Sequence, residues 1–343
     1  MVVSIRRALG VAVVAAAAGT ASLAAQAPTP PQLTVGGVVY TQYVYQLKDS
    51  VNHFNNFDIT RAYVNALGRF AGGVTTRVTT DVQRVGAGDN SLRLRLKYAF
   101  ATYTPQGSAL TFKAGLIHTP WLDWEEALWD YRQQGAMAMD RAGYMSASDY
   151  GVGVDGKWMA DKVNFQVTVV NGTFYSNTST SQGKDAQARL SVRVLDTDDS
   201  SRVGGLRVTG YAGYGRAAAG DRNRFMGMVS YRSKQLTLAG EAATTQDSTE
   251  TPVGLKAGHV YSAFGVYKFP QSKAAIIARV DVTHKQAGAV DKQTRYIAGV
   301  SYQLSPNWRL LGDWDLADYQ TDALNTANFA TRSQALFQTQ FTF

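Results

Sequence analysis

Polar and apolar residues alternate at every second position along most of this chain. Between residues 74 and 84, Val74, Val78 and Val82 fall on one face, whereas Arg77 and Asp81 fall on the other with threonines between them. A period of two is typical of a β-strand whose two faces meet different environments, and a helix would scatter these valines among polar positions. The segment therefore predicts a two-faced strand.

The stretch 91–100, SLRLRLKYAF, repeats this pattern with a cation at every second position. The alternation predicts that the leucines, followed by Tyr98 and Phe100, face one solvent and that Arg93, Arg95 and Lys97 face another. The same test along the whole sequence predicts sixteen strands, at residues 33–47, 57–70, 74–85, 91–104, 109–118, 149–158, 163–171, 186–195, 205–215, 223–233, 235–245, 259–269, 274–284, 293–304, 307–317 and 331–343.

The connections between these segments alternate in length. Those after even-numbered strands are short, such as AGG and PQGS, and those after odd-numbered strands are generally longer and polar; residues 196–204 are the exception among the short ones. All eight prolines fall outside the predicted strands, as expected because proline removes a ladder donor. The pattern predicts a meander with short turns at one rim and long loops at the other.

A sheet of this size must protect its edges. We find no amphipathic helical segment long enough to cover sixteen strands, whereas closure into a barrel satisfies every backbone group. The predicted fold is an all-β outer-membrane β-barrel of about 16 antiparallel strands, spanning residues 33–343 as one domain. The alternative is a soluble protein of several packed sheets.

The N-terminal segment indicates export. Arg6 and Arg7 precede an apolar run from about Ala8 to Ala18 and a small-residue cleavage region, so residues 1–25 are predicted to be a secretory signal peptide and 26–32 a short proline-rich linker. A transmembrane anchor is the alternative. Export to the bacterial outer membrane makes a nucleic-acid partner unexpected, although the formal net charge is +8.

The C-terminal strand ends in alternating aromatic residues, Phe337, Phe341 and the last residue, Phe343. An aromatic rim suits the interface of a lipid bilayer. This ending resembles the signature of bacterial outer-membrane barrels that their assembly machinery reads. We therefore expect outer-membrane lipid and the barrel assembly machinery among the partners.

The faces opposite the apolar ones are rich in cations. Setting each apolar face toward lipid leaves six acids on the inner faces, Asp81, Asp155, Glu241, Asp281, Asp313 and Asp315. The same faces hold seventeen cations: Arg61, Arg69, Arg77, Arg93, Arg95, Lys97, Lys113, Lys157, Arg189, Arg193, Arg207, Arg224, Arg232, Arg279, Arg295, Arg309 and Arg332. A charge at the bilayer midplane costs about 2–4 kcal/mol, so these faces are predicted to line water.

A basic lumen predicts a diffusion channel that favours small anions, phosphate among them, because low-dielectric walls focus the field. For any single arginine, a cross-strand pair with a carboxylate is an alternative role. The densest cluster supplies the candidate anion contacts, which are Arg61, Arg77, Arg93, Arg95, Lys97 and Lys113. A general porin without anion specificity and a non-conducting structural or adhesive barrel are the alternative functions.

The longest connection runs from about residue 118 to 148 and is too apolar to extend into solvent. We expect it to fold into the barrel as a constriction loop; a lid over the mouth or a subunit contact is the alternative. Its expected constriction residues, whose acids would face the basic wall, are Trp121, Asp123, Trp124, Glu125 and Glu126.

Several short segments resemble successive blocks of the phosphate-selective porin O and P family: residues 57–64, 110–120, 149–152, 169–172 and 238–242. The resemblance implies a sixteen-stranded trimeric barrel, an inward-folded third loop and a path for anions rich in arginine and lysine. Arg61 and Lys113 fall within matching blocks. The chain is short for that family, and its third loop has no arginine-rich run.

Other chemistry finds little support in the sequence. There are no cysteines, which excludes disulfides, thiol catalysis and Cys-ligated metals. The four histidines fall in or beside predicted outer loops, and no Gly-x-Ser-x-Gly motif occurs. The acidic run 196–199 lacks the spacing of a calcium loop. We therefore expect no enzyme activity, no metal and no cofactor.

Overall fold

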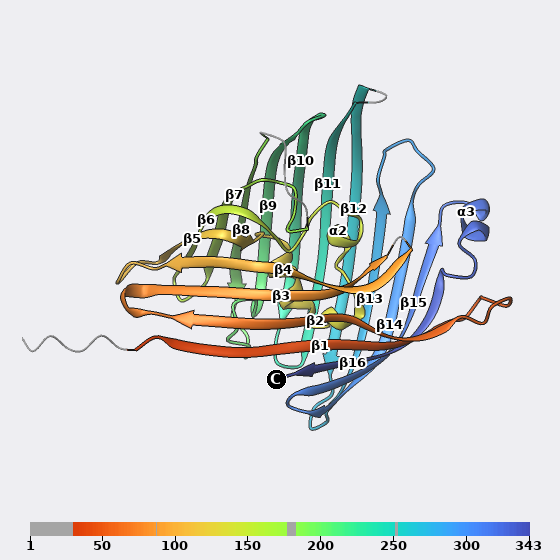
Figure 1. Cartoon of the computed structure of the whole chain (residues 1–343), viewed down its shortest axis with the longest axis horizontal. Coiled ribbons are helices and arrows are strands. Elements are labelled where there is room, and N and C mark those ends of the chain that lie inside the picture. Colours follow the sequence, from red (N-terminus) through yellow and green to blue (C-terminus); the bar gives the residue numbers. More distant parts are fainter. Residues whose placement is uncertain (1–29, 87, 177–182, 251–252) are drawn as a thin grey trace, which may run out of the picture.

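The computed structural model describes residues 30–86, 88–176, 183–250 and 253–343. Within these ranges, sixteen strands pair antiparallel with their neighbours in the chain, and the first pairs with the last to close the barrel (Figure 1). The predicted fold class is confirmed. The predicted signal peptide and most of the linker lie outside the described residues and stay predictions. No helix in the described ranges has the length and apolarity to cross a membrane.

The elements follow in chain order, and the labels are those of Figure 1. The strands are β1 Gln32–Gln46, β2 Asn55–Arg69, β3 Val74–Gly86, β4 Asp89–Tyr103, β5 Leu110–His118, β6 Ser148–Trp158, β7 Val163–Val170, β8 Asp185–Leu195, β9 Gly205–Ala217, β10 Gly220–Arg232, β11 Leu236–Glu250, β12 Val253–Lys268, β13 Ala274–His284, β14 Gln293–Ser305, β15 Trp308–Tyr319 and β16 Ser333–Thr342. The helices are η1 Ala71–Gly73, α1 Leu122–Trp129, η2 Arg132–Gln134, α2 Ala138–Arg141 and α3 Asp322–Ala327.

The predicted strand boundaries lie within a few residues of those observed, except at one hairpin. β11 and β12 continue about five residues further toward the long-loop rim than the alternation indicates, with pairs such as Asp247 opposite Lys256. Most residues of this extension are polar, so no apolar face marks it. Backbone pairing alone extends the hairpin there.

The barrel closes where the two ends of the chain meet. Val38 to Gln46 of β1 lie opposite Thr342 to Gln334 of β16. The amide of Gly37 donates to the Phe343 carbonyl at 2.8 Å, and the Phe343 amide donates to the Gly37 carbonyl at 3.0 Å. A Cβ at Gly37 would lie 2.4 Å from the Phe343 ring, so only glycine lets the terminal aromatic pack here. The final residue is thus part of the seam (Figure 1).

A β-bulge in β4 changes which residues face inward. Thr79 pairs with Tyr98 and Thr80 pairs with Leu96, so Lys97 is an extra residue without a partner in β3. A bulge shifts the side-chain alternation by one position. As a result Lys97 and Tyr98 are both buried inside the barrel, and the prediction that Tyr98 and Phe100 face lipid is wrong.

The long connection between β5 and β6 lies inside the barrel. It carries α1, η2 and α2, and its apolar side chains pack against buried residues of β9 to β13 and of β15. Figure 1 shows α2 beside β12. Trp121, Trp124 and Trp129 are almost fully buried in this contact. The apolar content that predicted an inward fold is therefore what attaches the loop to one side of the wall.

Candidate functional site: the barrel constriction

The inward loop leaves an open cavity along β1 to β4, which we call the passage. A cavity of about 330 Å³ lies there between the wall and the loop. Arg77, Lys97 and Tyr63 line it from the wall, and Asp123, Glu126, Asp130, Arg132 and Arg202 line it from the opposite side. The narrow part of the barrel thus has a cationic wall and a loop of mixed charge.

The wall charges are held by aromatic rings and neutral groups. The Lys97 ammonium lies 4.4 Å from the Tyr63 ring centroid and 5.5 Å from that of Tyr98. The Arg77 guanidinium lies 4.4 Å from the Tyr98 centroid, and its Nη1 is 3.0 Å from Nε2 of His118. Aromatic faces orient a cation without neutralising it. Both positive charges therefore act on the passage.

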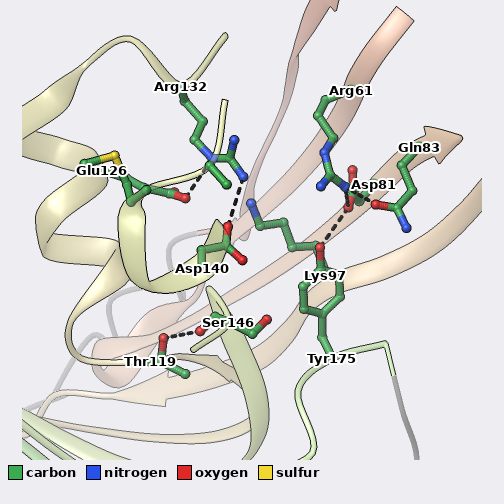
Figure 2. A network of polar contacts seen from close by, with 12 residues as sticks. Arg61, Asp81, Gln83, Lys97, Thr119, Glu126, Arg132, Asp140, Ser146 and Tyr175 are labelled. Atoms are coloured by element: carbon green, nitrogen blue, oxygen red, sulfur yellow. Dashed lines mark hydrogen bonds and ion pairs between the residues drawn. The ribbon is translucent and has the colours of Figure 1, made fainter. Parts of the chain in front are cut away.

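Next to them, one buried carboxylate joins two arginines. Asp81 is fully buried and accepts from Arg61 at 2.8 Å and from Arg95 at 2.9 Å. Gln83 accepts from both arginines as well. The Tyr175 hydroxyl, which comes from the loop after β7, donates to Asp81 at 3.1 Å (Figure 2). This cluster has a net positive charge and is held in place at the wall.

The loop side carries a second charged cluster. Arg132 donates to Glu126 at 2.8 Å and lies 3.4 Å from Asp140, and Figure 2 shows this group facing Lys97 and the Asp81 cluster. Burial alone would lower the pKa of Arg132, but the nearby Glu126 and Asp140 carboxylates raise this pKa above its usual value. Burial raises the pKa of Asp140 despite the favourable charge of Arg132. The loop therefore presents carboxylates that its own arginine partly neutralises.

Asp123 lies at the start of α1 and is ionised. Burial alone would raise its pKa, but His118 and Arg202 hold the pKa of Asp123 well below its usual range. Arg202 donates to Oδ2 of Asp123 at 2.6 Å. Asp123 and Glu126 line the cavity together with Arg77 and Lys97 of the wall.

Glu125 does not face the passage, so the expectation for this residue is wrong. It is fully buried between α1 and β11, where its carboxyl group meets that of Glu241. Burial, and then the Glu241 charge, raise the pKa of Glu125 well above its usual value. Trp121 lies on the same side and donates to Glu241 at 3.2 Å. The helical turn separates Glu125 from the neighbouring acids, because positions 121 and 125 share a face.

Two predicted anion contacts lie away from the constriction. Lys113 is buried, and its ammonium is 2.7 Å from Asp155 of β6. Arg93 is exposed and is one inward-facing position closer to the long-loop rim than Arg95. The structure brings Arg61, Arg77, Arg95 and Lys97 together and leaves these two outside the group.

Fewer inward cations lack a nearby carboxylate in the structure than the count of charges on the strand faces predicted. Carboxylates that the face count omitted supply many partners, including Asp130, Asp196 and Asp199 from loops and turns. At least ten of the seventeen cations have a carboxylate within 4 Å: Arg61, Arg95, Lys113, Arg193, Arg224, Arg232, Arg279, Arg295, Arg309 and Arg332. The lumen is a charge-paired lining with local positive excess.

Other residues at the site were not identified from the sequence. Arg132, Asp140 and Tyr175 fall in loops, where face alternation gives no signal, and Arg202 falls in a turn with the composition of a solvated segment. Within the described part of the chain, no three His, Asp or Glu side chains gather as metal ligands.

The sequence matches no protein family model, and no characterised protein matches it at the sequence level. Several solved structures share its fold. OmpT of Vibrio cholerae, an outer membrane protein solved with loop L8 deleted, covers 91% of this chain and 99% of its own at a TM-score of 0.65 and 14% identity. Salmonella typhi OmpF covers 91% of this chain and 97% of its own, at a TM-score of 0.59 and 14% identity. A mutant Rh. blastica porin covers 91% of this chain and 100% of its own, at a TM-score of 0.55 and 15% identity. At these identities the similarity establishes the fold.

Proposed function

We propose that this protein is a porin: a water-filled diffusion channel of the bacterial outer membrane that passes small hydrophilic solutes with a weak preference for anions. The observation that carries the proposal is the constriction, where Arg77 and Lys97 face Asp123 and Glu126 across an open cavity. Opposite charges on two sides of a narrow passage orient polar solutes, and low-dielectric walls strengthen the field.

The outer surface supports a membrane location. Leu92, Leu94 and Leu96 are exposed on the outside of β4, and Phe341 and Phe343 are exposed at the end of the chain. An apolar band with aromatic residues at its rim suits a bilayer. Outer-membrane lipid is then the partner of this surface, and the predicted signal peptide at residues 1–25 supplies the route of export.

The charges at the constriction support weak anion preference. On the wall, Asp81 offsets only one of the four cations Arg61, Arg77, Arg95 and Lys97. On the loop side, acids and arginines nearly balance. The passage therefore has a modest positive excess.

The resemblance to phosphate-selective porins makes phosphate one candidate anion. Three constriction arginines, however, already bind carboxylates, with Arg61 and Arg95 on Asp81 and Arg132 on Glu126. Arg77 is held by neutral groups and is a single donor side chain. A selective phosphate site needs arginine donors that are open to the ligand. We therefore favour a general porin over a phosphate-specific one.

A homotrimer is proposed on one ground. The Vibrio cholerae OmpT structure solved as a trimer covers 92% of this chain at a TM-score of 0.65 and 12% identity. Cross-linking in outer-membrane fractions should give a species of three subunits, and a purely monomeric pattern would contradict this part of the proposal.

Planar-bilayer recording of the purified protein tests the function. Discrete, stable conductance steps are expected. A folded protein that inserts without conducting would support the structural or adhesive alternative instead. Block of the chloride current by phosphate at or below low millimolar concentration would favour the phosphate-specific porin over the general one.

A further inference from the structure

The connection between β8 and β9, residues 196–204, lies at the short-turn rim, and part of it reaches into the barrel. Its Val203 is buried in the same apolar cluster as Trp124 of the constriction loop. Arg207, at the start of β9, donates to the Gly204 carbonyl at 3.0 Å. The turn therefore folds back into the barrel and meets the constriction loop.

One end of α1 is bound by Arg202 of this turn. Its Nη1 donates to Oδ2 of Asp123 at 2.6 Å and its Nη2 donates to the Asp123 carbonyl at 2.7 Å. Its guanidinium also lies 5.6 Å from the Trp124 ring centroid. Arg202 lines the constriction cavity, so its charge and that of Asp123 act on the passage together.

The other end of α1 is bound through Asp199. Asp199 accepts from Nε of Arg232 at 2.7 Å, and Nη1 of Arg232 donates to the Ala127 carbonyl at 2.7 Å and the Leu128 carbonyl at 3.2 Å. These are the C-terminal carbonyls of the helix, which lack partners within the helix and carry its negative end. Asp199 orients the arginine that satisfies them.

Hydrogen bonds within the turn and to the neighbouring strands hold residues 196–204 in place. The Thr197 hydroxyl donates to the Arg232 carbonyl at 2.5 Å and accepts from the Gly205 amide at 3.1 Å. The Ser201 amide donates to Oδ1 of Asp199 at 2.7 Å. A Cβ at Gly204 would lie 2.0 Å from the Asp199 carbonyl oxygen, so glycine is required for this close approach. Such a turn can hold another element in place.

We propose that residues 196–204 form a turn clamp that fixes the constriction loop from the short-turn side, and that its Arg202 is a selectivity-determining residue of the channel. This inference rests on the proposed porin function. Arg202 sets the charge of the passage by neutralising Asp123, and Asp199 is a positioning residue that acts through Arg232.

The charge role is tested with Arg202→Gln in planar bilayers. Removing the cation leaves Asp123 unneutralised beside the passage. The ratio of anion to cation permeability should fall by about twofold, the effect of one unit charge acting through water over about 10 Å. Lys234→Gln is the matched control, because Lys234 is exposed on the same rim and its side chain does not line the cavity. The control should keep the wild-type ratio.

The positioning role is tested with Asp199→Asn, which keeps the acceptor for the Ser201 amide and removes the charge that holds Arg232. Asp199 does not line the constriction cavity, so a change of selectivity is not its main expected effect. Hydrogen exchange at the α1 amides should become about tenfold faster, since a hydrogen bond to a charged group is weakened. Asp196→Asn is the control, because exposed Asp196 pairs only with Arg193 and Lys162 in the described structure.

The outcomes separate the two proposals. A wild-type protein without conductance overturns the porin function, whatever the exchange data show. A conducting wild type with Arg202→Gln at the wild-type permeability ratio overturns the role of Arg202. Equal rates of hydrogen exchange at the α1 amides in Asp199→Asn and Asp196→Asn overturn the clamp, even if the channel conducts.

Discussion

The ammonium of Lys97 lies 4.4 Å from the centroid of the Tyr63 ring and donates a long hydrogen bond of 3.4 Å to its hydroxyl. No carboxylate among the described residues forms an ion pair with it within 4 Å. The bulge at Lys97 places this side chain inside the barrel together with that of Tyr98. Lys97 is therefore a principal source of uncompensated positive charge at the constriction.

Replacing Lys97 with glutamine should lower the anion preference. The ratio of anion to cation permeability, measured from reversal potentials, should fall by about twofold. Lys157→Gln is the control, since Lys157 is an exposed residue near the end of β6 and does not line the cavity. Equal ratios of anion to cation permeability in the two variants would show that Lys97 does not act on the ion path.

Replacing Asp81 with asparagine should have the opposite effect on selectivity. Asp81 is fully buried and offsets part of the charge of Arg61 and Arg95, so its loss makes the wall more positive. The anion preference should rise, and the barrel should unfold at a lower temperature, because removing one member of a buried ion network leaves unpaired charges. A lower anion preference would contradict the assignment of this cluster to the pore wall.

The attachment of α1 should weaken as pH rises. Burial, and then Glu241, raise the pKa of Glu125 well above 4.5, so the folded protein holds a proton that an exposed Glu125 would release. The stabilisation is complete below the pKa of exposed glutamate and is lost as pH rises through the higher folded value. Hydrogen exchange at α1, corrected for its intrinsic pH dependence, should show less protection at pH 9 than at pH 5. Glu125→Gln should flatten this difference, and a difference that persists in the variant would assign it to another group.

Removing Trp124 should widen the channel. Its side chain is almost fully buried, and the Arg189 guanidinium lies 4.0 Å from its ring centroid. Trp→Ala at such a site costs about 3–5 kcal/mol, enough to loosen the loop from the wall. Trp124→Ala should therefore show larger and noisier single-channel currents than the wild type. Unchanged conductance and noise would mean that the loop is held without this contact.

The sequence predicts the barrel well because each strand has one polar face and one apolar face. The alternation of residue types along the chain shows these two faces directly. It cannot predict the bulge at Lys97, because an inserted residue leaves the local pattern SLRLRLKYAF regular while the pairing shifts. The outward-facing leucines of β4 were identified correctly, and the position of Tyr98 was not.

The candidate site is predictable only in part, for a related reason. Assigning charges by strand face omits loops and turns, so the partners Asp130 and Asp199 went uncounted. In the third loop, the spacing of Trp121, Glu125 and Leu128 fits one face of a helix, a signal that would have placed Glu125 on the buried side. For Arg202 we find no local signal, since its contact with Asp123 is made across the barrel.

The proposed function requires a water-filled passage with a modest positive excess at its constriction. The most direct test is the reversal potential of the purified wild-type protein in a planar bilayer under a potassium chloride gradient. Discrete channels are expected, with a small reversal potential of the sign that anion preference gives. A reversal potential of the opposite sign, showing preference for potassium, would contradict this requirement.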